Sequence, residues 1–160
     1  MKRLAVIGLC CLFGVGITSM ASPSGSRSDA TLDLCAVRSS IQQAVVVRTN
    51  AFPSNSLRFT FPAHVSITSK LRARTLASAV CGLQSLPTPA PKCPADRGVT
   101  YLVRFVGPNL RVSIRPYGCE FVSGAGPDRW VVFSPGFWRT LGRQMGMPTA
   151  NLKTFQGRRS

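Results

Sequence analysis

The segment from Cys81 to Cys119 constrains the fold of this chain most strongly. It holds three of the four cysteines that follow the apolar N-terminal stretch, and the fourth is Cys35. An even number of cysteines in an exported chain predicts disulfides, and four cysteines allow three pairings. Three prolines lie between Cys81 and Cys93, a loop that a short-range disulfide would close. We therefore predict Cys81–Cys93 and Cys35–Cys119, with the alternatives 35–81 with 93–119 and 35–93 with 81–119.

The N-terminus has the three-part pattern of a secretory signal. Lys2 and Arg3 precede an uncharged apolar run over 4–17, and small residues follow at the positions that a signal peptidase reads. The alternative is a transmembrane anchor, but the run is short for a span of about 20 residues. We expect a signal peptide over 1–21, and a flexible tether over 22–30 because that stretch is small and polar.

Hydrophobic periodicity in the rest of the chain predicts an α+β fold. Apolar residues alternate in short strands and recur every three or four residues in helices expected over 69–82 and 134–146. Strands that follow each other directly indicate antiparallel pairing, so we expect an antiparallel sheet with two helices packed on one face and stapled by disulfides. We predict a single domain over 31–148 and a loosely ordered basic tail over 149–160.

The clearest hairpin joins strands over 99–106 and 111–115. A four-residue loop containing Pro108 places Val106 opposite Arg111 and Phe105 opposite Val112. In that register the apolar side chains share one face, whereas a slip of one residue would mix arginines into it. The same register puts Arg104, Arg111 and Arg115 on the opposite face, where they form a basic strip and a candidate anionic contact.

The charge balance favours anionic partners. The chain carries 20 Lys and Arg against 5 Asp and Glu, a formal net charge of +15. The arginines are dispersed, and no run of them resembles a nucleic-acid arm, so specific nucleic-acid binding is not expected. The expected partner is an anionic polymer of the cell envelope or another exported protein, and no membrane span is expected once the signal peptide is removed.

Groups suited to catalysis are scarce. His64 is the only histidine, and no GxSxG motif accompanies it. Asp96, Glu120 and Asp128 are the acidic candidates outside the N-terminal region, and each also fits a turn or an ordinary partner of an arginine. The sequence contains no phosphate-binding loop, dinucleotide fingerprint, CxxC or metal motif. We therefore expect a non-enzymatic protein without a cofactor or metal.

The proline-rich segment suggests a different function, that of a secreted protease inhibitor. Such an inhibitor presents a preorganised exposed loop to its target. The stretch PTPAPKCP could be that loop, with Lys92 as the side chain read by a trypsin-like protease.

Six segments carry a resemblance to known proteins: VVVRTNAFP, FTFPAHVSIT, LASAVCGLQSLP, KCPADRGVTYLVRF, GCEFVSGAGPDRW and SPGFWRTLGRQMG. Together they resemble small exported actinobacterial proteins of unknown function, which share four cysteines and the CP-x-D-x-G-x-x-Y and GCE motifs. The resemblance implies export and disulfides, and it implies no reaction. A looser architectural likeness is to small secreted subtilisin-inhibitor proteins, which also join a helix-borne cysteine to a later cysteine-rich sheet.

Overall fold

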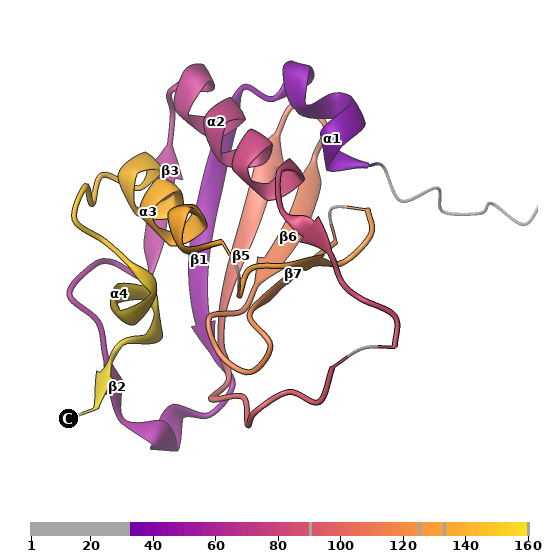
Figure 1. Ribbon diagram of the computed structural model, residues 1–160. Coiled ribbons are helices and arrows are strands. Elements are labelled where there is room, and N and C mark those ends of the chain that lie inside the picture. Colours follow the sequence, from indigo (N-terminus) through magenta and orange to yellow (C-terminus); the bar gives the residue numbers. More distant parts are fainter. Residues whose placement is uncertain (1–32, 90, 125, 133, 160) are drawn as a thin grey trace, which may run out of the picture.

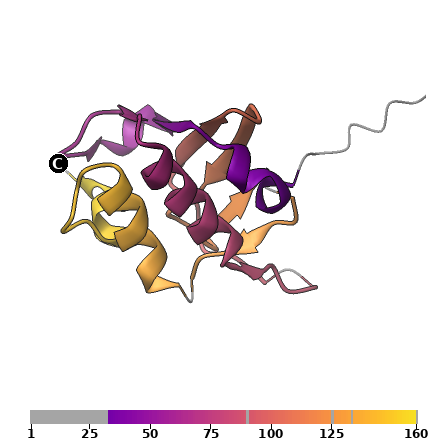
Figure 2. The same cartoon turned by 90° about the horizontal axis from the view of Figure 1, so that it is seen from above.

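Residues 33–89, 91–124, 126–132 and 134–159 are described by the structure, which is a computed structural model. They form a seven-stranded antiparallel sheet with the helices on one face, which confirms the predicted α+β class (Figure 1). Seen from above, α2 (Lys70–Cys81) and α3 (Pro135–Gln144) lie together on that face (Figure 2). The expected signal peptide over 1–21 and tether over 22–30 lie outside the described residues.

The sheet combines strands that are distant in sequence. Its order is β3-β1-β5-β6-β7-β8-β4, and β2 pairs separately with β9. The strands are β1 (Gln43–Asn50), β2 (Leu57–Arg58), β3 (His64–Ile67), β4 (Gln84–Ser85), β5 (Val99–Val106), β6 (Leu110–Ile114), β7 (Phe121–Ser123), β8 (Arg129–Trp130) and β9 (Arg158–Arg159). The helices are α1 (Leu34–Val37), α2 (Lys70–Cys81), α3 (Pro135–Gln144) and α4 (Leu152–Gln156).

The two long helices form where periodicity predicts them. The Ser69 hydroxyl accepts a hydrogen bond from the Arg72 amide and so caps α2, while α3 begins at Pro135, whose fixed φ suits a first helical turn. The predicted ranges overrun each helix by one or two residues. Small side chains on α2 let it approach the sheet closely, and the buried face of each helix is apolar: Ala73, Leu76, Ala77 and Val80 on α2, and Phe137, Trp138 and Leu141 on α3.

The β5–β6 hairpin has the predicted faces but not the predicted pairs. Phe105 lies opposite Leu110 and Arg104 opposite Arg111, so the register differs by two residues from the prediction. Residues 107–109 connect the two strands, so β6 begins one residue earlier than we expected, and Asn109 in the turn adopts a left-handed conformation with φ 54°. A shift of two residues leaves every side chain on its original face, and for this reason burial alone could not distinguish the two registers.

The predicted disulfide pairing is wrong. Cys35 bonds to Cys81 and Cys93 bonds to Cys119, with Cα separations of 5.5 Å and 4.9 Å. The short helix α1 packs beside α2 and brings Cys35 to the last residue of that helix. After α2 the chain joins the edge of the sheet through β4, which carries the proline segment away from Cys81. Short separation in sequence therefore did not bring Cys81 and Cys93 together.

The C-terminal segment is also not the loosely ordered tail that we expected over 149–160. Phe155 on α4 is fully buried and packs edge-on against Tyr101, with 5.3 Å between ring centroids. The Tyr101 hydroxyl donates a hydrogen bond of 2.7 Å to the Phe155 carbonyl. Within the described residues, the domain therefore extends to Arg159, the end of β9.

Among the described residues, none of the helices combines the length and the apolar character needed to cross a bilayer.

Candidate functional site

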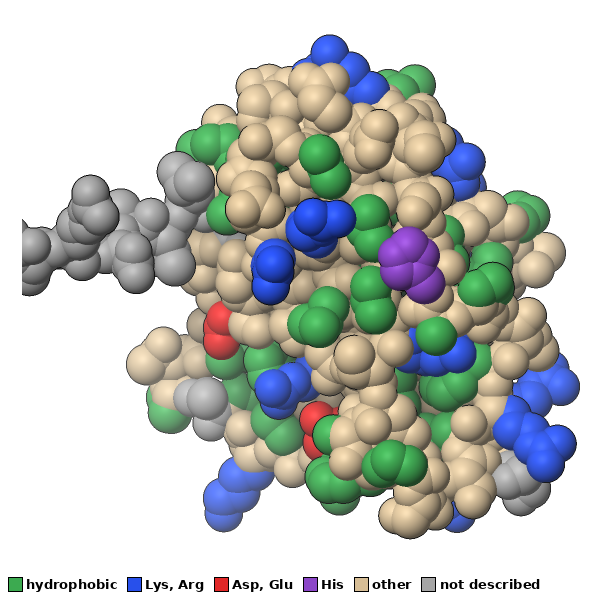
Figure 3. All heavy atoms as spheres, turned by 180° about the vertical axis from the view of Figure 1, so that it is seen from behind, with side chains coloured by type: hydrophobic (Ala, Val, Ile, Leu, Met, Phe, Trp, Pro, Cys, Tyr) green, Lys and Arg blue, Asp and Glu red, His purple; other side chains and the backbone are tan. Residues whose placement is uncertain are grey.

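The predicted basic strip lies on the sheet face that the helices leave uncovered. Arg104 and Arg111 are direct cross-strand neighbours and are exposed. Arg115 follows β6 and lies 3.9 Å from a carboxylate oxygen of Asp96, with its guanidinium over the ring of Phe121. From behind, basic and hydrophobic side chains share this face (Figure 3). The structure brings Arg104 and Arg111 together on an open surface, whereas Arg115 lies four residues farther along the chain from Arg111 and is partly neutralised by Asp96.

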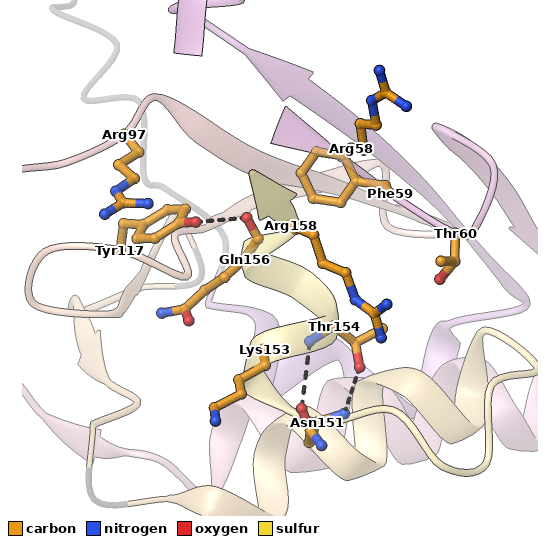
Figure 4. A pocket seen from close by; sticks show the side chains of 11 residues that line it. Arg58, Phe59, Thr60, Arg97, Tyr117, Asn151, Lys153, Thr154, Gln156 and Arg158 are labelled. Carbon is orange, nitrogen blue, oxygen red and sulfur yellow. Dashed lines mark hydrogen bonds between the residues drawn. The ribbon is translucent and has the colours of Figure 1, made fainter. Parts of the chain in front are cut away.

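A second group of cations surrounds a hollow beside α4. The hollow has a volume of about 690 Å³ and is lined by Arg58, Arg97, Lys153 and Arg158, together with uncharged residues. These four residues come from β2, the segment before β5, α4 and β9 (Figure 4). The fold thus gathers into one basic hollow four cations that are up to 100 positions apart in sequence.

Hydrogen bonds fix the walls of the basic hollow. The Tyr117 hydroxyl donates to the Gln156 carbonyl at 2.6 Å, and the Gln156 side chain donates to the Pro116 carbonyl at 2.9 Å. Asn151 and Thr154 cap the start of α4 reciprocally. The hollow is therefore built between ordered elements, and not between free chain ends.

Among the described residues, none of these four cations takes part in an ion pair. None of the described residues that line the basic hollow is acidic. Within the described part of the chain, Arg115–Asp96 is the one ion pair. Several like charges around a concave surface create a positive potential that attracts anions, and the low-dielectric walls strengthen it.

A smaller hollow adjoins the basic one. Its volume is about 460 Å³, and Asn151 and Lys153 line both hollows. Most of its other walls are apolar and come from the segment after β8, the start of α3 and the start of α4: Val131, Val132, Pro135 and Leu152. Glu120 and Arg139 supply its remaining charges.

Glu120 is held firmly in the smaller hollow. Its backbone is left-handed with φ 44°, a conformation that is uncommon for a residue other than glycine. The neighbouring Cys119 is tied to Cys93, and the Glu120 carbonyl accepts a 2.7 Å hydrogen bond from the Val131 amide. Burial raises the pKa of the Glu120 carboxyl, and a hydrogen bond of 3.2 Å from the indole nitrogen of Trp138 partly opposes this. Residues in such strained conformations concentrate at functional sites.

The structure separates the other candidate residues. His64 is exposed on β3, the outer strand of the sheet, and Asp128 is exposed in a turn. The Asp96 carboxylate accepts a hydrogen bond from the Gly98 amide, as expected for a turn residue. Lys92 is exposed beside the disulfide-bonded Cys93. Within the described ranges, no three His, Cys, Asp or Glu side chains are grouped as a metal site requires.

Sequence reasoning missed the basic hollow. Arg158 lies in the segment that was expected to be loosely ordered, and Arg58 and Arg97 carry no local motif. The one available signal was Phe155, an aromatic residue in a polar tail, which could have indicated that the C-terminus packs on the core.

Comparison with known proteins adds no assignment. No protein-family model, curated protein sequence or solved structure matches this chain.

Proposed function

We propose that this protein is an exported, non-enzymatic binding module whose basic hollow takes an anionic partner, an acidic polymer of the cell envelope. The observation that carries the proposal is the gathering of Arg58, Arg97, Lys153 and Arg158 around one hollow with no acidic lining residue among those described. Guanidinium and ammonium groups form charge-assisted hydrogen bonds with carboxylate, phosphate and sulfate oxygens. The net charge of +15 adds long-range attraction for any such polymer.

Export is supported by two features. The N-terminal sequence has the pattern of a cleaved signal, and the four cysteines beyond it form two disulfides, which persist in oxidising compartments. The non-enzymatic part of the proposal is supported by the isolation of Glu120, since no second carboxylate or histidine lines its hollow among the described residues.

The test compares two pairs of arginine or lysine residues that differ in position but not in charge. Lys153→Ala with Arg158→Ala removes two cations from the basic hollow, and Arg104→Ala with Arg111→Ala removes two from the open strip. Affinity for polyphosphate and for a hyaluronan octasaccharide is measured by calorimetry at several salt concentrations. We expect the first pair to lose about tenfold or more, because each charge-assisted hydrogen bond contributes about 1.5–3 kcal/mol. The control pair should retain most of its affinity.

Two results would reject the proposal. Equal losses from both pairs would mean that the charge acts diffusely and that the hollow is not a site. Affinity that does not weaken as salt rises would exclude an electrostatic contact.

A protease inhibitor is the second candidate, and one specific observation supports it. The extended segment around Lys92 is fastened to the sheet by Cys93–Cys119, so an exposed basic side chain lies beside a fixed point of the chain. Inhibition requires such preorganisation. Incubation with trypsin distinguishes the candidates. An inhibitor blocks trypsin stoichiometrically, and its Lys92→Ala variant no longer does so. Rapid cleavage after Lys92 without inhibition excludes a function as a trypsin inhibitor.

A further inference from the structure

The two hollows adjoin at α4, and together we call them the trough. Asn151 and Lys153 line both of them, so a ligand in the basic hollow lies next to the smaller one. Figure 4 shows these two residues at one end of the basic hollow, with Arg97 at the other side and Arg158 extending alongside α4. Such a ligand would meet cations first and then Glu120.

The smaller hollow needs a partner of different chemistry. A carboxylate accepts hydrogen bonds and donates none when ionised. One oxygen of Glu120, Oε2, accepts from the Trp138 indole, while Oε1 has no hydrogen-bond partner among the described residues. The apolar walls, including Val132 and Leu152, suit a surface made of C–H groups. A hydroxyl-bearing unit with one apolar face satisfies both requirements.

We propose that the trough binds an acidic oligosaccharide. An acidic group of the saccharide lies in the basic hollow, and the adjoining neutral sugar lies in the smaller hollow. A hydroxyl of that sugar donates to Oε1 of Glu120, and its C–H face packs on the apolar walls. This inference rests on the proposed function and names the class of polymer that the basic hollow takes.

Two alternative polyanions fit the trough less well. Polyphosphate carries charge on every unit and would bring a negative group to Glu120. Single-stranded nucleic acid gains much of its affinity from bases stacked on exposed aromatic rings. In the basic hollow an arginine already occupies one face of each ring, since the Arg97 guanidinium lies 5.2 Å from the centroid of Tyr117 and that of Arg48 lies 3.9 Å from the centroid of Phe59.

The experiment uses a substitution that should strengthen binding if only net charge matters, and weaken binding if Glu120 accepts a hydrogen bond from the sugar. Glu120→Gln removes a negative charge, so simple electrostatics predicts tighter binding of every polyanion. The amide retains an acceptor for Trp138, which protects the fold. If Glu120 receives a sugar hydroxyl, the loss of a charged acceptor should weaken a hyaluronan octasaccharide about tenfold, while polyphosphate binds equally well or more tightly.

A second variant covers the case in which Glu120→Gln perturbs folding. Val132 is 41% exposed at the smaller hollow, so Val132→Arg fills the hollow at little cost to the core. We expect this change to weaken the octasaccharide and to strengthen polyphosphate. Both proteins and the wild type are titrated with the octasaccharide, polyphosphate and an eight-residue oligothymidylate, and circular dichroism checks their folding.

The outcomes separate the inference from the proposed function. If both polyanions bind through Lys153 and Arg158 but neither variant selectively weakens the octasaccharide, the saccharide inference is wrong and the anion site stands. Tighter binding of the oligothymidylate than of the octasaccharide also overturns the inference. If no probe binds, the proposed function fails and the inference fails with it.

Discussion

Arg129 shows how one half-buried cation is accommodated in a strongly basic chain. Its guanidinium donates to the carbonyls of Cys81 and Leu83 at 3.0 Å and 3.1 Å, and it contacts the sulfur of Cys35 at 3.4 Å. These carbonyls lie at and just beyond the C-terminal end of α2, where the helix leaves acceptors unpaired and carries partial negative charge. Arg129 therefore links β8 to the helix and to the first disulfide, and its charge is unavailable for an external anion.

Glu120, unlike Arg129, carries its charge in an environment that disfavours it, and this predicts that the stability of the protein depends on pH. Burial raises the pKa of its carboxyl in the folded protein, so the native state binds more protons than the unfolded state above about pH 4.3, the ordinary value for Glu. Stability contributed by this group is therefore present at low pH and is lost as pH rises through the folded-state pKa. Glutamine does not ionise, so the Glu120→Gln variant does not lose this stability as pH rises. We expect the free energy of unfolding of the variant, relative to wild type, to increase between about pH 4 and about pH 7.

Urea denaturation at a series of pH values measures this difference. A difference that stays constant, or that decreases as pH rises, would show that Glu120 is not held in a medium unfavourable to its charge. Because each protein is compared with the other at the same pH, titration of the remaining carboxyls cancels.

At the scale of elements, α4 contributes more to stability than its five residues suggest. Phe155 joins a cluster of rings with Tyr101, Phe61 and Trp138, with centroids 5.3–5.7 Å from its own. Phe155→Ala would leave a cavity in this cluster and should lower the free energy of unfolding by about 3–5 kcal/mol.

Lys153→Ala on the same helix is the matched control for Phe155→Ala. Its side chain is exposed, so it should change stability by no more than about 0.5 kcal/mol. Chemical denaturation decides the matter, and a loss below about 1 kcal/mol for Phe155→Ala would mean that α4 is not part of the cooperative core.

The elements also show what the sequence could predict. Alternation placed Tyr101, Val103 and Phe105 on one face, and all three are buried. The spacing of Leu76 and Val80 placed α2, because burial of an apolar stripe depends on local periodicity alone. Local patterns of this kind fixed the α+β class.

Features that depend on distant contacts were not predictable in this way. The walls of the basic hollow include Tyr117 and Gln156, which are 39 residues apart in sequence and joined by a hydrogen bond. The pairing of Cys35 with Cys81 depends on how α1 packs against α2. The sequence of neither helix contains a local pattern that predicts this contact. A search for local motifs therefore identified the cysteines but neither their partners nor the site.

At the scale of the whole molecule, the charges are divided between two surfaces with different character. The open sheet face carries Arg104 and Arg111 on a nearly flat surface, where solvent screens them. The trough along α4 places Lys153 and Arg158 in a concavity bounded by hydrogen-bonded walls. Net charge alone cannot distinguish these surfaces, and the concave shape of the trough is the reason that we propose it as the site.

The two disulfides fasten different parts of this architecture, and their pairing gives the last prediction. Trypsin cleavage after Lys92 places Cys81 and Cys93 on separate peptides, so a non-reducing digest reports the pairing directly. We expect residues 28–38 joined to 75–92, and residues 93–97 joined to 112–129. A disulfide-linked peptide that joins 75–92 to 93–97 would instead show a Cys81–Cys93 bond, the pairing predicted from the short separation in sequence.

Removing each bond should have a distinct consequence. The bonds span 46 and 26 residues, for which the chain-entropy model gives about 4 and about 3.5 kcal/mol at 25 °C. Replacing Cys35 and Cys81 by serine should therefore lower stability slightly more, because it frees the longer loop. Replacing Cys93 and Cys119 should also release the backbone beside Glu120 and so weaken octasaccharide binding in protein that is still folded. Urea denaturation and calorimetry on the two double variants measure both effects, and unchanged binding in the second variant would show that the disulfide does not organise the trough.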